Sequence, residues 1–142
     1  MTKLPSFPKV NDKGPPFLND GQTEAEFIDG RIADGPPADP VPAFVIDVKV
    51  LKSNNPMNAV GQTHTIRVKC RGYSWGRTVQ TLVAAFGTLP KMAISTEVAE
   101  GLLASGKLKG RKATIEQTSK SNDKGATWRD YNAAPLEPNA VL

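Results

Sequence analysis

The chain has few of the residues that carry metal or redox chemistry. Among its 142 residues there is one cysteine and one histidine, whereas a zinc site needs several such ligands at suitable spacing. A single cysteine cannot form an internal disulfide, which agrees with a reducing compartment. No apolar run approaches the length that crosses a bilayer, and the first residues contain no apolar signal segment. We therefore expect a cytoplasmic protein with no metal, no cofactor and no membrane partner.

A catalytic constellation is missing as well. His64 and Cys70 share one face of a predicted strand but lie too far apart along it for direct contact. Residues 101–108, GLLASGKL, nearly match a phosphate-binding loop, but a leucine replaces the hydroxyl residue that would hold Mg²⁺. This segment also lies within and after a predicted helix, where such a loop does not occur. We therefore predict a binding protein and not an enzyme.

Proline and acidic residues are concentrated at the start of the chain. Residues 1–42 hold eight of the 12 prolines, and residues 1–40 hold seven acidic and four basic side chains. Proline removes backbone donors, so we predict that residues 1–42 form a Pro-rich, mildly acidic, partly flexible leader and linker. Within it, residues 22–31 fit either a short helix or a strand entering a turn. Phe7 and Phe17 are candidates to dock on the following domain.

The rest of the chain is basic and predicts one domain over residues 43–135, followed by a short tail at 136–142. After residue 40 the sequence holds 14 basic and 7 acidic side chains, which favours a polyanionic partner such as nucleic acid. Alternating apolar residues predict core strands over 43–52 and 63–71. Two more strands, at 111–120 and 126–133, flank a loop in which Gly125 takes the position that needs a positive φ.

Helical periodicity replaces the strand pattern between these two pairs of strands. Apolar residues at i, i+3, i+4 and i+7 predict a helix over 77–86, with Gly87 as its left-handed C-terminal residue. A second helix is predicted over 95–105, capped by Ser95 or Thr96. The fold class is therefore mainly β with helical insertions, an α+β chain with two helices between the second core strand and the C-terminal hairpin.

Basic and aromatic side chains form the candidate binding surface. In the strand at 63–71, His64, Ile66, Val68 and Cys70 should face the core and the intervening cations should face outward. Cations hold phosphates and aromatic planes stack bases. Trp128 and Tyr131 fall on opposite faces of their strand, and we expect Tyr131 to be the outward one; Trp75 is open between core and surface. The candidate nucleic-acid-binding residues are Arg67, Lys69, Arg71, Tyr73, Trp75, Lys109, Arg111, Lys112, Lys120, Trp128, Arg129 and Tyr131.

The order of these elements resembles the OB-fold single-stranded-DNA-binding proteins of bacteriophages. The residues that carry the resemblance are FVIDVKVLKSNN, GQTHTIRVK, GRTVQTLVAAFG and LKGRKATIEQTSKSNDKGATWRDYNAAP, which together cover 43–135. The resemblance implies a small antiparallel β-barrel that is interrupted by helices and ends in a long hairpin. Many such proteins end in an acidic tail that recruits replication proteins, whereas PLEPNAVL carries only Glu137.

The function expected from the sequence is sequence-tolerant binding of single-stranded DNA. The resemblance implies a role in phage DNA replication or recombination in the host cell cytoplasm, with phage or host replication and recombination proteins as partners. Duplex DNA is a further possible ligand. An RNA-binding module on the same barrel is one alternative, since stacking and phosphate contacts do not separate RNA from DNA. A small virion or interaction protein that binds no nucleic acid is the other.

Overall fold

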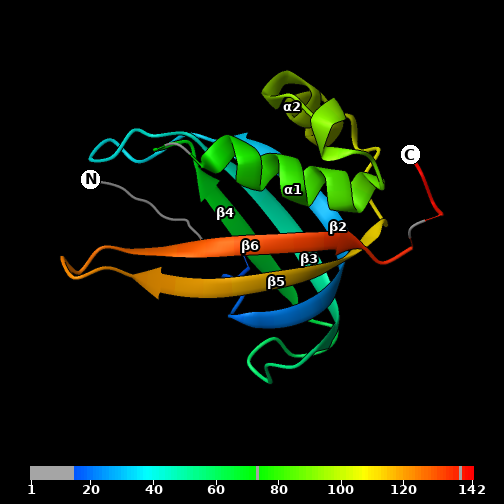
Figure 1. Ribbon diagram of the computed structural model, residues 1–142, viewed down its shortest axis with the longest axis horizontal. Helices are drawn as coiled ribbons and strands as arrows, with labels where there is room; N and C mark the ends of the chain where they lie inside the picture. Colours follow the sequence, from blue (N-terminus) through cyan, green and yellow to red (C-terminus); the bar gives the residue numbers. More distant parts are fainter. Residues whose placement is uncertain (1–14, 73, 138) are drawn as a thin grey trace, which may run out of the picture.

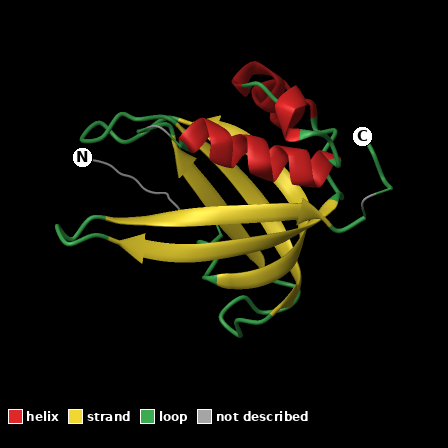
Figure 2. Ribbon diagram, viewed as in Figure 1, coloured by secondary structure: helices red, strands yellow, loops and turns green. Residues whose placement is uncertain are grey.

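The computed structural model describes residues 15–72, 74–137 and 139–142. Within these residues the strands form one antiparallel sheet in the order β4-β3-β2-β5-β6. Helix α1 lies beside β6, with α2 beyond it (Figure 1), and the helices together cover one part of the curved sheet (Figure 2). The predicted α+β class is therefore confirmed. In chain order the elements are β2 (Gly21–Ala33), β3 (Ala43–Ser53), β4 (Thr63–Lys69), α1 (Trp75–Gly87), the 3₁₀ helix η1 (Lys91–Ala93), α2 (Thr96–Ser105), β5 (Lys112–Ser121) and β6 (Thr127–Pro135).

Strand β2 is the centre of the sheet, which corrects the prediction that residues 1–42 are leader and linker. It pairs with β3 on one side and β5 on the other. Thr23, Ala25 and Phe27 alternate along it and are buried at 0%, 0% and 1% exposure. The alternation is weak in the sequence because the first two of these residues are small and only slightly hydrophobic. The domain therefore begins before residue 43, and residues 22–31 belong to a strand.

The glutamates of β2 face lysines on its neighbours. Glu24 lies opposite Lys52, and Glu26 lies between Lys49 of β3 and Lys112 of β5. Opposite charges on neighbouring strands stabilise a sheet, so these glutamates and lysines stabilise the domain itself. From residue 15 onward the sequence holds 15 basic and 13 acidic side chains. The domain as a whole is thus less basic than predicted, and its net charge does not by itself indicate a polyanionic partner.

The core lies between the sheet and α1. On β3, Phe44, Ile46 and Val48 are buried as predicted. Helix α1 packs on the sheet through Phe86, whose ring meets Phe27 of β2 edge to face at a centroid distance of 5.3 Å. Burial of such large apolar side chains is the main stabilising term, about 1.5–3 kcal/mol for each. The helix is thereby fixed against the central strand.

The helix ends confirm the predicted capping of α2 and correct that of α1. Ser95 Oγ accepts a hydrogen bond from Val98 N at 3.1 Å at the start of α2. The left-handed residue after α1 is Thr88, with φ of 52°, and not Gly87. Gly87 is buried, and a Cβ there would approach Leu89 Cδ1 to 3.1 Å, so close packing accounts for this glycine.

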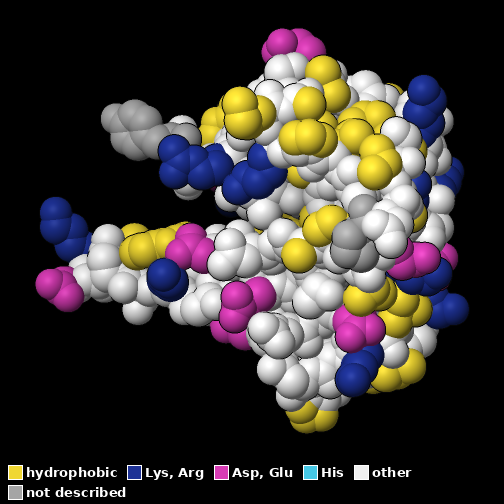
Figure 3. Space-filling model, turned by 45° about the vertical axis from the view of Figure 1, so that its right-hand side comes forward, with side chains coloured by type: hydrophobic (Ala, Val, Ile, Leu, Met, Phe, Trp, Pro, Cys, Tyr) yellow, Lys and Arg dark blue, Asp and Glu magenta, His cyan; other side chains and the backbone are white. Residues whose placement is uncertain are grey.

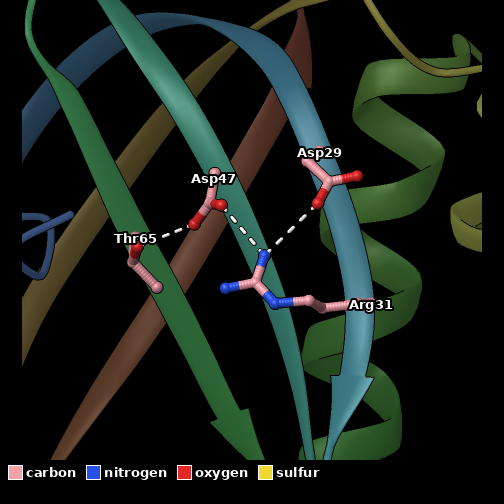
Figure 4. A network of polar contacts seen from close by, with 4 residues as sticks. All are labelled: Asp29, Arg31, Asp47 and Thr65. Carbon is pink, nitrogen blue, oxygen red and sulfur yellow. Dashed lines mark hydrogen bonds and ion pairs between the residues drawn. The ribbon is translucent and has the colours of Figure 1, made fainter. Parts of the chain in front are cut away.

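A polar network on the face opposite the core ties β2, β3 and β4 together (Figure 4). Arg31 Nη1 lies 2.9 Å from Asp47 Oδ2 and 3.4 Å from Asp29 Oδ2. Thr65 Oγ1 donates to the other oxygen of Asp47 at 2.7 Å. Asp47 is only 9% exposed, so its carboxylate depends on these donors. The network holds β4 in its place at one edge of the sheet.

The closed barrel is not formed by strand pairing within the described residues, because β4 and β6 are the two edges of the sheet. Helix α1 packs against both of these strands. Among the described residues, the part of β5 beyond Gln117 pairs only with β6. The ends of β5 and β6 therefore form a projecting hairpin, which is defined as residues 118–130 (Figure 1). The open side of the sheet therefore lies between β4 and the projecting hairpin.

Candidate nucleic-acid interface

A groove runs between β4 and the projecting hairpin. Its volume is about 810 Å³. Figure 3 shows the molecule hollowed beside the projecting hairpin, with lysine and arginine side chains along the opposite rim. Basic and aromatic residues from both walls meet there. The groove is lined by Phe17, Pro36, Asp39, Arg67, Val68, Lys69, Arg71, Ser74, Trp75, Thr78, Ser119, Thr127, Trp128, Arg129 and Tyr131.

The β4 wall carries cations, as the alternation of the strand predicted. Val68 is buried at 8% exposure, whereas the side chains of Lys69 and Arg71 are 52% and 58% exposed. Arg67 is half-buried and lines the same groove. Because their neighbours in the strand point into the core, these cations are displayed along one edge of the groove.

Cys70 of this wall is partly buried, and burial raises the pKa of its thiol above the ordinary value of 9.0. A thiol that stays protonated at neutral pH is a poor nucleophile. His64 is 2% exposed, and its Nδ1 lies 3.2 Å from the carbonyl oxygen of Phe17. The predicted structural roles of these two side chains agree with their burial.

On the hairpin side of the groove, the orientations of Trp128 and Tyr131 differ from the prediction. Trp128 is 44% exposed, whereas Tyr131 packs against the core cluster. Burial raises the pKa of Tyr131 to about 12. The reason is register: Tyr131 lies opposite the buried Gln117, and Trp128 lies opposite the exposed Lys120 on the projecting hairpin. Trp128 is therefore the aromatic residue available for stacking on this strand.

Phe17 is a groove residue that the sequence prediction left out. Phe17 is 50% exposed, and the guanidinium of Arg129 lies 5.4 Å from its ring centroid, within the range of a cation–π interaction. The backbone around it is attached to β4, since Thr65 N donates to Pro16 O at 2.8 Å and Leu18 N donates to Thr65 O at 2.9 Å. Phe17 therefore docks on the domain, as the sequence suggested, and presents an aromatic face to the groove.

Asp20 fixes the base of the projecting hairpin. Its carboxylate accepts hydrogen bonds from Gln117 Nε2 at 3.0 Å, Ser119 N at 3.1 Å and Ser119 Oγ at 2.9 Å. The bonds from Gln117 and Ser119 hold the pKa of Asp20 below its ordinary value of 3.8. At neutral pH the ionised carboxylate therefore anchors the hairpin wall beside the segment that carries Phe17.

Trp75, which the sequence left open, belongs to both the core and the groove. It is the first residue of α1 and is half-buried. Its ring stacks on Phe44 at a centroid distance of 6.0 Å and an interplanar angle of 24°. The ring is thus held rigidly at the wall of the groove, with one face already covered by Phe44.

An acidic residue of the segment 34–42, which connects β2 and β3, also lines the groove. Lys69 Nζ lies 3.2 Å from Asp39 Oδ2, and Arg71 Nη2 donates to Asp39 Oδ1. The hydrogen bond from Lys69 and the charge of Arg71 hold the pKa of Asp39 below 3.8. Asp39 is therefore ionised at neutral pH and neutralises part of the cationic wall.

Four of the predicted binding residues do not line the groove, and Tyr73 lies outside the described residues. Arg111 is structural: its Nε donates to Phe86 O at 2.6 Å and its Nη2 to Gly87 O at 3.3 Å, at the C-terminus of α1. Lys112 Nζ lies 3.7 Å from Glu137 Oε1, and Lys120 Nζ lies 3.0 Å from Asp130 Oδ2 on the projecting hairpin. Lys109 is exposed between α2 and β5. These four predicted residues are therefore not among those that line the groove.

No protein-family model and no curated protein matches this chain. Within the described residues no helix is long and apolar enough to cross a membrane. The groove brings together seven residues of the predicted set with two that were not predicted, Phe17 and Asp39. The seven are Arg67, Lys69, Arg71, Trp75, Trp128, Arg129 and Tyr131.

Proposed function

We propose that the groove binds single-stranded nucleic acid, with single-stranded DNA as the ligand and little preference for sequence. The observation that carries this proposal is the combination of cations and exposed aromatic rings on facing walls. Arg67 and Lys69 stand on one side, Trp128 and Arg129 stand on the other, and Phe17 adds a further ring. Phosphates are held by the cations, and bases stack on aromatic planes whatever their identity.

The shape of the site also favours an unpaired strand. A base can reach Trp128 or Phe17 only if its π-face is accessible, which base pairing and stacking within a duplex prevent. The open side of the sheet supports an OB-like, partly open five-stranded barrel, in which such a groove is a usual binding surface for oligonucleotides. In this proposal the protein covers single strands during DNA replication or recombination in phage-infected cells.

A competition experiment tests the proposal. A fluorescein-labelled oligo(dT) is bound to the protein, and unlabelled single-stranded DNA, duplex DNA or RNA of matched length is added while anisotropy is recorded. Single-stranded DNA of mixed sequence should compete about as well as oligo(dT), and duplex should compete poorly. Equal competition by matched RNA would favour the RNA-binding alternative, and a lack of binding to any of these ligands would overturn the proposal.

A further inference from the structure

The carboxylate of Asp39 contacts both cations at the end of the β4 wall. One oxygen faces Lys69 Nζ at 3.2 Å and the other accepts from Arg71 Nη2. A phosphodiester group also presents two oxygens on one atom that share one negative charge, and charge-assisted contacts from lysine and arginine are the usual way to hold it. The arrangement around Asp39 is therefore one that suits a backbone phosphate.

The backbone of the connecting segment fixes the position of Asp39. Asp39 N donates to Pro36 O at 2.8 Å, and Val41 N donates to Asp39 O at 2.8 Å. A Cβ on Gly35 would collide with the carbonyl oxygens of Asp39 and Val41, so the segment folds closely on itself at that glycine. Pro36 and Asp39 line the groove together. The carboxylate is thus presented to the groove by a defined turn.

The contacts of Asp39 are of a kind that a competing anion can replace. The side chains of Lys69 and Arg71 are 52% and 58% exposed, and that of Asp39 is 31% exposed. Ion pairs at this exposure contribute little and are screened by salt. A carboxylate held weakly at this position can leave its cations when a ligand with several phosphates enters the groove.

We propose that Lys69 and Arg71 form a phosphate subsite, that Asp39 occupies it in the unbound protein, and that a phosphodiester group of the strand takes its place on binding. The inference rests on the proposed function. The exchange predicts that the groove binds nucleic-acid strands more tightly than single phosphate groups. A mononucleotide or inorganic phosphate must displace a tethered carboxylate of high effective concentration, whereas a strand is held by Arg67 and Arg129 while the exchange takes place.

The test compares two charge-removing variants on the same segment. Asp39→Asn keeps the shape of the side chain but loses its charge, and Asp34→Asn removes one charge from an exposed residue that does not line the groove. Affinity for fluorescein-labelled oligo(dT) is measured by anisotropy at about 50 mM salt. We expect D39N to bind about three- to ten-fold more tightly than the wild type, and D34N to bind within about two-fold of it.

A double-mutant cycle separates the exchange from a general charge effect. In a chain that carries Lys69→Ala and Arg71→Ala, the subsite is gone, so D39N should change affinity no more than D34N does. Inorganic phosphate, used as the second probe, should compete with the oligonucleotide better in D39N than in the wild type. Thermal melting of each variant verifies that the fold is intact.

The outcomes separate this inference from the proposed function. If the wild type binds oligo(dT) and D39N binds it no more tightly, the exchange is overturned and the proposed function stands. A gain in D39N that D34N matches, or that persists without Lys69 and Arg71, also overturns the exchange. If neither the wild type nor D39N binds, both proposals fall.

Discussion

Replacement of Trp128 is the substitution that most sharply separates stacking from charge. Trp128 is 44% exposed on the projecting hairpin, where β5 and β6 pair only with each other among the described residues. Its removal should therefore leave the core intact. Stacking of one base on an aromatic ring contributes about 1–3 kcal/mol. Trp128→Ala should weaken binding of single-stranded DNA by roughly 5- to 150-fold, and Trp128→Phe should retain most of the affinity.

Tryptophan fluorescence offers a direct assay because the chain contains two tryptophans, Trp75 and Trp128. One face of Trp75 is covered by Phe44, so most of the quenching that a stacked base causes should come from Trp128. Trp75→Phe should keep most of the quenching on addition of oligo(dT), and Trp128→Phe should lose most of it. Full quenching in the Trp128→Phe protein, or wild-type affinity in the Trp128→Ala protein, would refute the stacking role.

Three further substitutions test the anchors and the cations. Asp20 is exposed, so solvent screens its contacts, and Asp20→Asn should destabilise the fold by less than about 1 kcal/mol at neutral pH. Because folding lowers the pKa of Asp20, its contribution is present above pH 3.8 and is lost as the pH falls below that value. Urea unfolding should therefore show that the difference in stability from the wild type disappears in acid. Replacing Arg67 and Lys69 together with alanine should reduce the salt dependence of DNA binding by about 1.4 in log K per log salt, and an unchanged slope would place both outside the interface. Arg111→Met should lower the free energy of unfolding by about 1–3 kcal/mol and leave DNA affinity unchanged. A large loss of affinity would show that Arg111 contacts DNA after all.

The strands with strong apolar alternation could be predicted from the sequence. In β3, large apolar side chains recur at alternate positions from Phe44 to Val50. Those of α1 repeat with helical spacing, so local pattern and tertiary structure agree in both elements. Strand β2 could not be predicted in this way. Thr23 and Ala25 at its core positions carry little hydrophobic signal, and its glutamates are explained only by the lysines of β3 and β5.

Only part of the groove could be predicted from the sequence, for a similar reason. Arg67 and Lys69 follow from the alternation of one strand, but the choice between Trp128 and Tyr131 depends on the register of β5 against β6. Phe17 and Asp39 come from Pro-rich stretches that show no periodicity, and long-range contacts with β4 place them in the groove. Pairwise contacts between distant segments are the information that a single sequence does not display.

The salt dependence of binding to single-stranded DNA measures how many phosphates the cations of the groove neutralise. Phosphate contacts release counterions from the strand, about 0.7 for each phosphate neutralised. With Arg67, Lys69, Arg71 and Arg129 in the groove, the affinity of the wild-type protein for a labelled oligo(dT) should fall with a slope of about 3 in log K per log salt. Saturable binding at low salt with this slope would support the account, whereas binding that salt does not weaken, or no binding at low salt, would contradict it.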